Sequence, residues 1–537
     1  MTRKIFFFLT TISLFMACRP NSHEGKMIFR YNESAGIATL DPAYAKDLAL
    51  IWGCSQIYNG LIQLDTNLEV QPCIAKYWEI SPDGKEYKFV LRDDIYFHKN
   101  ELFNTPDSTR KVVAKDFIYS FQRILDPDIA SPGLWIFNNV AENGFVAKDD
   151  TTFIIRLKEP FSPFLSLLGM PYFSVVPHEV ADHYGADFRN HPCGTGPFKL
   201  QLWKEGVKLV LRRNDNYFET DEAGHSLPYL DAVAVTFIVD EQTQFLEFIK
   251  GNLDFMNSLK PSYKDEILTR TGQLKAKYAD RINMVSTPYL NTEYLGFLMD
   301  NEQSPLHDKR IRQALNYGFD RKKMMKYMRN NVGKPGLYGF IPYGLPGFDT
   351  TTPGYGYNPQ KAKELLAEAG FPNGKGLPEL TLATTANYAD LCKYIQQQLN
   401  LLGFDIKVDV NPPASLREQM AQGKSAWFRG SWIADYPDAE NYLSLFYSPN
   451  KAPNGPNYTH FKNARYDKLY EEAKQTSDEA TRIKLYHQMN EILMEEAPVI
   501  VLYYDQILHF TQKNVTGLRS NAMNALDLKR VKIEPAR

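Results

Sequence analysis

A chain of 537 residues is too long to fold around one hydrophobic core, because single cores stop growing at about 250–300 residues. We therefore expect two or three lobes. The composition is that of a soluble globular protein, with 44% hydrophobic and 23% charged residues. The formal net charge is −2, and the basic and acidic residues are interspersed. This argues against a nucleic-acid partner, which would require a basic face.

The first eighteen residues have the pattern of an export signal. Arg3 and Lys4 precede an apolar stretch over residues 5–16, which is too short to span a bilayer but suits a secretory signal. Ala17-Cys18 at its end resembles a bacterial lipoprotein processing site, which implies that Cys18 becomes an acylated N-terminus holding the protein at a membrane. The alternative is a secreted protein in which Cys18 is incidental. We expect residues 1–18 to be the signal and 19–26 a polar tether.

Four further cysteines are widely spaced along the chain: Cys54, Cys73, Cys193 and Cys392. Their spacing matches no metal-binding knuckle and includes no CxxC motif. We expect buried thiols, or at most one disulfide, and no metal site. Beyond residue 27 no apolar stretch approaches 18 residues, so the sequence predicts no other membrane span.

Strand and helix patterns alternate along the rest of the chain. Apolar spacing predicts strands at residues 26–31, 87–92 and 499–504, and helices at residues 112–124, 358–370 and 480–496. Residues 332–358 are rich in Gly, Pro and Tyr. They predict a long irregular connection, which is either functional or a linker.

A series of short motifs, in order, resembles the oligopeptide/dipeptide solute-binding family of bacterial ABC importers, also called extracellular solute-binding protein family 5. The N-terminal motifs are Leu40-Asp41-Pro42, Ile57-Tyr58-Asn59-Gly60-Leu61, Pro72-Cys73-Ile74-Ala75-Lys76-Tyr77-Trp78-Glu79 and Tyr119-Ser120-Phe121-Gln122-Arg123. The later motifs are Gly194-Thr195-Gly196-Pro197-Phe198, Asp308-Lys309-Arg310-Ile311-Arg312-Gln313-Ala314-Leu315-Asn316 and Trp432-Ile433-Ala434-Asp435-Tyr436-Pro437-Asp438. The resemblance extends from about residue 30 to residue 504.

The resemblance implies a fold of the α/β, periplasmic-binding-protein-like class, with three lobes, mixed sheets, a two-strand hinge and a ligand cleft between lobes. Lobe I would comprise residues 27–59, 191–287 and 501–537, lobe II residues 60–190, and lobe III residues 288–500. The hinge strands would lie near Pro288-Tyr289-Leu290-Asn291 and at residues 499–504.

The same resemblance implies a function in transport. The protein would be a monomer outside the cytoplasm, lipid-anchored to the membrane, and periplasmic if the host has an outer membrane. It would capture short peptides and deliver them to a membrane permease and its ATPase, without a cofactor and without being an enzyme. The alternatives are another solute on the same scaffold (a nickel chelate, haem or an oligosaccharide) or a peptide-sensing or chaperone-like envelope protein.

Asp435 is the principal candidate for the binding site. It lies three residues after Trp432 in a motif that resembles the one whose aspartate pairs with the peptide N-terminus in this family. A charge-assisted hydrogen bond of this kind contributes about 1.5–3 kcal/mol. The competing interpretation is a surface aspartate that opens the turn at Tyr436-Pro437-Asp438.

The resemblance also places a strand edge beside Asp435. Gly430, Ser431, Trp432 and Ile433 would hold the ligand backbone, with Gly430 permitting close approach. Leu48, with Asp47 and Ala49, resembles the facing edge from lobe I. Trp432 would either cover the ligand or pack within its lobe.

Arg429 stands where relatives that bind longer peptides place an arginine for the C-terminal carboxylate, a task that suits a guanidinium group. A second arginine of such relatives falls on Met420 here, so the grip on the carboxylate differs or is absent. Asn291 and Trp135 are weaker candidates for the cleft, and a core position is favoured for Trp135.

Other chemistry is poorly supported by the sequence. His178 and His183 flank Glu179 but are five residues apart, which places them on different helical faces rather than in the i, i+4 arrangement of a zinc helix. The chain contains neither a GxSxG nucleophile motif nor a GxxxxGK[ST] phosphate-binding loop.

Overall fold

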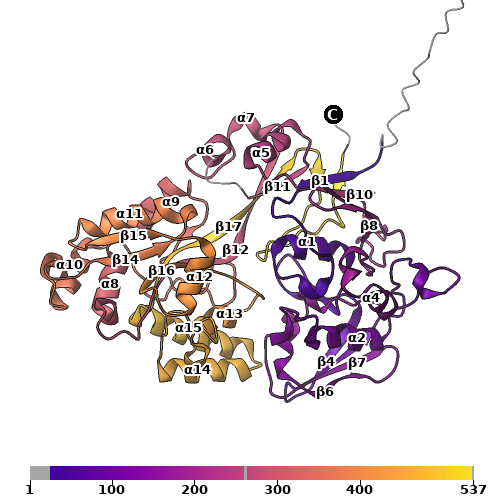
Figure 1. The fold of residues 1–537 in the computed structure, drawn as a ribbon, viewed down its shortest axis with the longest axis horizontal. Helices are drawn as coiled ribbons and strands as arrows, with labels where there is room; N and C mark the ends of the chain where they lie inside the picture. The colour runs from indigo at the N-terminus through magenta and orange to yellow at the C-terminus, as the bar shows by residue number, and fades with distance from the viewer. Residues whose placement is uncertain (1–24, 259–262, 535–537) are drawn as a thin grey trace, which may run out of the picture.

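The computed structural model describes residues 25–258 and 263–534. Two bodies are joined by two long strands, β12 (Ile282–Phe297) and β17 (Val499–Gln512) (Figure 1). The N-terminal body contains one end of the large sheet and a separate four-stranded sheet, and the C-terminal body contains the other end of the large sheet. The two ends of the large sheet and the separate four-stranded sheet are thus three centres of packing. This arrangement confirms the predicted α/β class with three lobes and mixed sheets.

The large sheet runs through both bodies in the order β15-β14-β16-β12-β17-β11-β1-β10-β9-β8, with β13 also paired to β17. The bounds not given above are β15 (Ile406–Val410), β14 (Leu380–Thr384), β16 (Trp427–Ile433), β11 (Phe255–Asn257), β1 (Ile28–Asn32), β10 (Ala232–Thr236), β9 (Lys208–Arg213), β8 (Phe198–Lys204) and β13 (Lys334–Pro335). Strands β1 and β10 are parallel, as are β14 and β15, whereas β12 is antiparallel to both of its neighbours.

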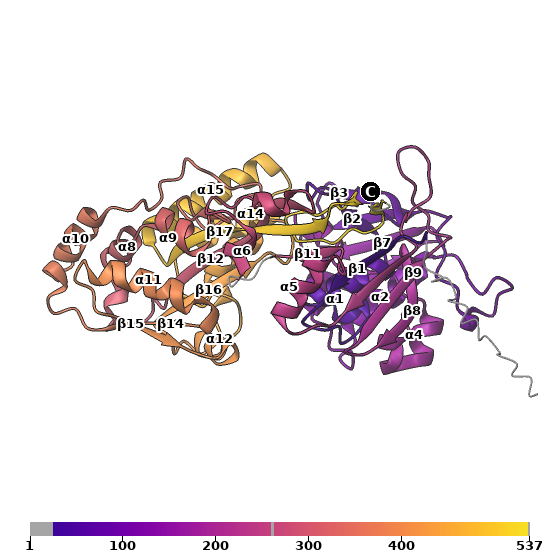
Figure 2. The same ribbon diagram turned by 90° about the horizontal axis from the view of Figure 1, so that it is seen from above.

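The two connecting strands run between the bodies (Figure 2). The hydrogen-bond ladder between them is interrupted. Residues 282–288 pair with 506–512, residues 292–296 pair with 499–504, and the register shifts between Pro288 and Thr292. The interruption gives the chain a place to bend, since Tyr289, Leu290 and Asn291 are not held to β17 by the ladder. The two predicted crossover strands are therefore present at these positions, and their role as a hinge stays a prediction. The predicted end of the second strand at residue 504 is wrong, because β17 continues through the polar Asp505 and Gln506 to Gln512.

The N-terminal body has the amphipathic elements that the sequence predicts. Its four-stranded sheet has the order β4 (Ala75–Ile80), β5 (Glu86–Leu91), β7 (Thr152–Leu157) and β6 (Val140–Ala147). Along β5 the alternate residues Tyr87, Phe89 and Leu91 are buried. Helix α2 (Ala114–Leu125) packs Phe117 and Phe121 against Phe153 of β7. Alternation of apolar and polar residues thus fixes which face of the sheet is covered.

The remaining elements surround these sheets. The helices are α1 (Leu48–Ile57), α3 (Phe164–Leu167), α4 (His178–Tyr184), α5 (Glu241–Lys250), α6 (Lys264–Ile267), α7 (Ala276–Ala279), α8 (Lys309–Tyr317), α9 (Arg321–Met328), α10 (Pro359–Glu368), α11 (Ala389–Asn400), α12 (Pro413–Ala421), α13 (Glu440–Leu443), α14 (Ala464–Gln475) and α15 (Glu479–Glu496). The short strands are β2 (Ile62–Leu64), β3 (Val70–Pro72), β18 (Val515–Thr516) and β19 (Lys532–Ile533). The three predicted helices are confirmed as α2, α10 and α15. The connection at residues 332–358 is irregular apart from β13, as predicted.

Cys54, Cys73, Cys193 and Cys392 are buried and unpaired, which confirms the prediction of isolated thiols. Within the described ranges, no helix is both long and apolar enough to cross a membrane. The predicted signal and Cys18 lie outside the described residues.

Candidate functional site

The free edge of β16 forms one wall of the candidate site. One edge of this strand pairs with β12 over its full length, from Trp427 to Ile433. On the other edge, β14 pairs with it only at Phe428. Within the described parts of the chain, the backbone beyond Phe428 therefore has no strand partner on that side. An extended ligand could add a strand at such an edge, with its main chain forming the hydrogen bonds.

Asp435 follows directly at the end of this edge. Its backbone N–H donates to Asn441 Oδ1 at 3.1 Å, and Asn441 Nδ2 donates back to its carboxylate at 3.2 Å. Among the described residues no cation forms an ion pair with Asp435. The residue is exposed, yet the surrounding protein raises the pKa of its carboxyl by desolvation, with Asn441 opposing this shift. A carboxylate that solvent can reach but that protein surrounds is typical of a cleft wall.

Asp47 of the N-terminal body lies on the other side of this region. It caps helix α1, accepting from the Leu50 N–H at 3.2 Å. Burial raises the pKa of the Tyr172 phenol, and the charges of Asp435 and Asp47 raise it further. Both carboxylates therefore act on one phenol, although they belong to different bodies. Leu48 and Ala49, which the resemblance places at the facing edge of lobe I, form the first turn of α1 behind an aspartate cap.

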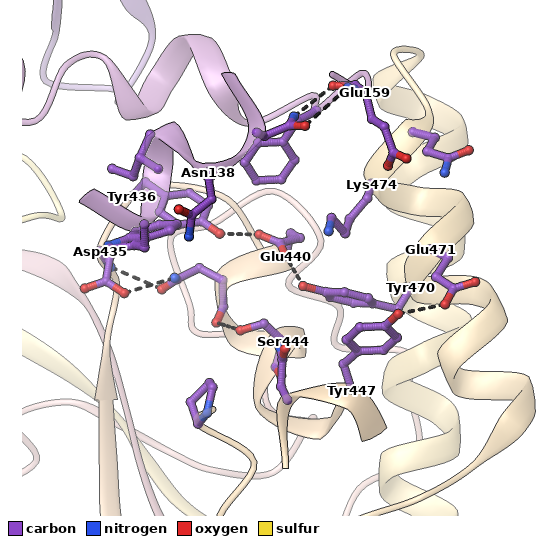
Figure 3. Close-up of a pocket in the computed structure, with 18 of the residues that line it drawn as sticks. Asn138, Glu159, Asp435, Tyr436, Glu440, Ser444, Tyr447, Tyr470, Glu471 and Lys474 are labelled. Carbon is purple, nitrogen blue, oxygen red and sulfur yellow. Dashed lines mark hydrogen bonds between the residues drawn. The ribbon is translucent and has the colours of Figure 1, made fainter. Parts of the chain in front are cut away.

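A cavity of about 770 Å³ lies between the two bodies next to Asp435 (Figure 3). Its walls are residues of the loop before β6 and the loop after β7 on one side, and of β16, α13 and α14 on the other. Its lining residues include Trp135, Asn138, Glu159, Phe161, Trp432, Asp435, Tyr436, Glu440, Asn441, Ser444, Tyr447, Tyr470, Glu471 and Lys474. The two bodies also touch beside it, where Ser162 Oγ donates to the Thr476 carbonyl at 2.5 Å.

A buried carboxylate, Glu440, bonds two tyrosines in the wall of the cavity. Glu440 accepts hydrogen bonds from the hydroxyls of Tyr436 and Tyr470 (Figure 3). Burial raises the pKa of Glu440, and the two phenols lower it. Because Tyr436 directly follows Asp435, this network fixes the turn that carries the candidate ligand-binding carboxylate.

Trp135 and Trp432 line the cavity from opposite bodies. Trp135 is 42% exposed and its ring centroid lies 6.1 Å from that of Tyr436. The core position favoured for Trp135 is therefore wrong, because its ring lines the cavity between the two bodies. Trp432 Nε1 donates to Asn441 Oδ1 at 2.9 Å, so the tryptophan and Asp435 are braced by the same amide. Trp432 packs within its lobe and also lines the cavity, which is consistent with both interpretations of its role.

Arg429 has partners within its own body. It forms an ion pair with Glu293 of β12, and its guanidinium lies 3.4 Å from the ring centroid of Tyr388. Arg429 and Glu293 are only 12% and 2% exposed at their side chains. Ser431 and Ile433 follow on the same face of β16 and are exposed. We call the free edge of β16, together with the adjoining part of the cavity at Trp432 and Asp435, the β16 groove. Arg429 is near this groove, but its charge is already compensated.

Two further predicted residues have packing roles that the sequence did not reveal. Gly430 lies opposite Tyr294 in the β12 ladder. A Cβ at Gly430 would come within 2.6 Å of the Tyr294 ring, so the glycine makes room for this ring. Asn291 is buried in the hinge and donates to Glu293 at 3.2 Å.

Sequence reasoning missed Asn441 and Glu293. Asn441 lies six residues after Asp435 in a polar turn, a position from which a short-range contact is common. Glu293 is the only acidic residue between Pro288 and Met299 in the hinge strand, and such an isolated charge among apolar residues was a usable signal. No cluster of three or more metal-ligating side chains exists within residues 25–258 and 263–534.

The sequence model of the bacterial extracellular solute-binding proteins, family 5 Middle, matches residues 69–454. The chain belongs to this family. It is accordingly an extracytoplasmic solute-binding component of an ABC importer, and the resemblance inferred from the motifs is confirmed.

The similarity to individual relatives covers nearly the whole chain. The glutathione-binding protein GsiB of Salmonella typhi is 27% identical, over 90% of each chain. The dipeptide-binding protein DppE of Bacillus subtilis is 28% identical, over 96% of this chain and 94% of the relative. Among solved structures, the periplasmic binding protein DppA of Helicobacter pylori in complex with the peptide STSA is 26% identical. It superposes with a TM-score of 0.75, over 95% of this chain and 98% of that one.

Proposed function

We propose that this solute-binding protein captures short peptides in the cleft between its two bodies and presents them to the permease and ATPase of its importer. Asp435 neutralises the peptide ammonium, and the free edge of β16 at residues 430–433 holds the peptide backbone. The names of the relatives support a peptide ligand: GsiB binds glutathione, DppE binds dipeptides, and the H. pylori structure contains a bound peptide. A nickel chelate, haem or an oligosaccharide is not favoured by these names.

One observation carries the proposal. Asp435 is a cleft carboxylate without a cationic partner among the described residues, and desolvation raises its pKa. Such a group is stabilised by any cation that enters the cleft. A peptide ammonium followed by an extended backbone complements the carboxylate and the adjacent strand edge together. Electrostatic pairing and main-chain hydrogen bonding then recognise features that every short peptide shares.

The test is calorimetric titration of the full-length protein with Ala-Ala-Ala and with N-acetyl-Ala-Ala-Ala. Acetylation removes the ammonium and retains the rest of the peptide. We expect the acetylated peptide to bind at least about 30-fold more weakly, because one partner of a desolvated charge pair is lost. Equal affinities for the two peptides would rule out the role of Asp435.

We further propose that Cys18 is the lipid-anchored residue and that the protein functions as a monomer. The apolar stretch of residues 5–16 ending at Ala17-Cys18 supports the anchor. Intact-mass measurement of the membrane-extracted protein should show a chain that begins at Cys18 and carries acyl groups. An unmodified N-terminus at another residue would contradict this.

The proposed lobe boundaries are residues 27–59, 191–287 and 501–537 for lobe I, 60–190 for lobe II and 288–500 for lobe III.

A further inference from the structure

Two arginines near β16 are compensated by carboxylates, and one of them, Arg429, lies at the end of the strand away from Asp435. Arg429 is paired with Glu293, which also accepts from the Tyr388 hydroxyl at 3.1 Å. Arg329 is paired with Asp505 at 2.5 Å and donates to the Tyr503 hydroxyl at 3.0 Å. Two guanidinium groups and two carboxylates leave this end without net charge.

A single amide connects the two ion pairs. Asn291 Nδ2 donates to Glu293 at 3.2 Å and to Asp505 at 3.4 Å. We call Asn291, Glu293, Arg329, Tyr388, Arg429 and Asp505 the Glu293 cluster. It joins the connecting strands β12 and β17 to β16 and to the turn before α11.

The Glu293 cluster is incompletely satisfied for a purely structural network. Arg429 Nε and Asn291 Oδ1 are buried and have no hydrogen-bond partner in the part of the chain that the structure describes. Most buried polar atoms in proteins are paired, and exceptions are frequent at functional sites. The next two residues on the same face of β16, Ser431 and Ile433, are exposed, so the cluster borders the groove.

A ligand carboxylate that approached Arg429 would meet the carboxylate of Glu293. Two carboxylates that share one guanidinium in a poorly solvated site repel each other. Displacing Glu293 instead would leave its carboxylate, which is 2% exposed at its side chain, without a cationic partner. A neutral amide at the C-terminus of the ligand neither repels Glu293 nor displaces it from Arg429. The electrostatics therefore favour a neutral ligand group at this end of the groove.

We propose that Glu293 is a specificity-determining residue that prevents Arg429 from selecting a free C-terminal carboxylate. The ligand class is then peptides with a free N-terminus, whether their C-terminus is free, amidated or extended by further residues. This inference rests on the proposed function, because it assigns the second end of the same groove.

The experiment compares Ala-Ala-Ala with Ala-Ala-Ala-amide by calorimetric titration of the full-length protein and of Glu293→Gln. The wild type should bind the two peptides within about threefold of each other. Glu293→Gln retains size and hydrogen bonding but frees the charge on Arg429, so it should bind the free acid about tenfold more tightly than the amide. The matched control is Glu302→Gln on an exposed loop of the same body, which should behave as the wild type.

The outcomes are distinct. A wild type that binds the free acid more than about tenfold better than the amide overturns the inference, whatever the variant does. A folded Glu293→Gln variant that still ignores amidation also overturns it. Should the variant fail to fold, the wild-type comparison alone decides. Failure of the proposed function would give a different result: Ala-Ala-Ala would not bind, or N-acetylation would not change its affinity.

Discussion

The two ends of the β16 groove differ in how their charges are balanced. At one end, Asp435 is held by the neutral amide of Asn441 and has no cationic partner among the described residues. At the other end, Arg429 is covered by the Tyr388 ring and paired with Glu293. Both side chains occupy positions at which family resemblance predicts contact with a peptide terminus. Their surroundings leave only the Asp435 end with an unbalanced charge.

This difference shows that a motif position does not by itself establish a binding role. Arg429 stands at the expected spacing from Asp435, but Glu293 of the hinge strand already forms an ion pair with it. An ionised side chain that lacks a counter-ion inside a cleft is the stronger sign of a ligand contact, because the ligand then provides the missing partner.

Replacing the unbalanced carboxylate should have the largest effect. We expect Asp435→Asn to weaken binding of Ala-Ala-Ala by about 30-fold or more, since the peptide ammonium loses its partner. The variant should bind N-acetyl-Ala-Ala-Ala about as well as the wild type does. Glu471→Gln is the control, because Glu471 also lines the cavity but accepts from Tyr447 at 2.7 Å. Calorimetric titration of the wild type and both variants with each peptide measures all six affinities, and an equal loss for both peptides in Asp435→Asn would contradict the assignment.

Acidification should weaken peptide binding through Asp435. Desolvation raises the pKa of Asp435 above its ordinary value of 3.8 in the free protein, and a bound ammonium would lower it again. A raised pKa stabilises the fold at low pH, and that contribution is lost as the pH rises through the folded-state value. Peptide binding has the opposite sign and weakens as the pH falls through that value, by at most about tenfold per pH unit.

The measurement for this pH effect is titration with Ala-Ala-Ala-amide, whose C-terminus does not ionise, at several values from pH 7.5 down to the acidic range. Asp435→Asn provides the reference and should show a flat profile. If the wild type is equally flat, no carboxyl group with a raised pKa is linked to binding.

Asp47 should contribute the smallest effect. It lies on the opposite body from Asp435 and acts on Tyr172 of its own body, but it is exposed and caps α1. Asp47→Asn keeps the cap, because asparagine and aspartate cap helices equally well. We expect it to weaken Ala-Ala-Ala binding by about two- to threefold through a screened charge. A loss as large as that of Asp435→Asn would make the two carboxylates joint partners of the ammonium.

The contrast between the two ends also marks what sequence could predict. The regular spacing of apolar residues predicted β5, α2, α10 and α15, because the pattern of each element lies within one continuous segment. Asp435 lay in a recognisable motif, and its partner Asn441 is only six residues away. The Glu293 cluster draws on residues 291 to 505, so no local pattern could bring it together. Trp135 was misplaced for a related reason, because an aromatic residue at a seam between bodies has the same local sequence as one in a core.

A crystal structure of the protein with Ala-Ala-Ala tests the central claim most directly. We expect the peptide ammonium to lie about 2.7–3.0 Å from the Asp435 carboxylate, with the peptide backbone along residues 430–433. A peptide bound elsewhere, with Asp435 directed into bulk solvent, would contradict the account.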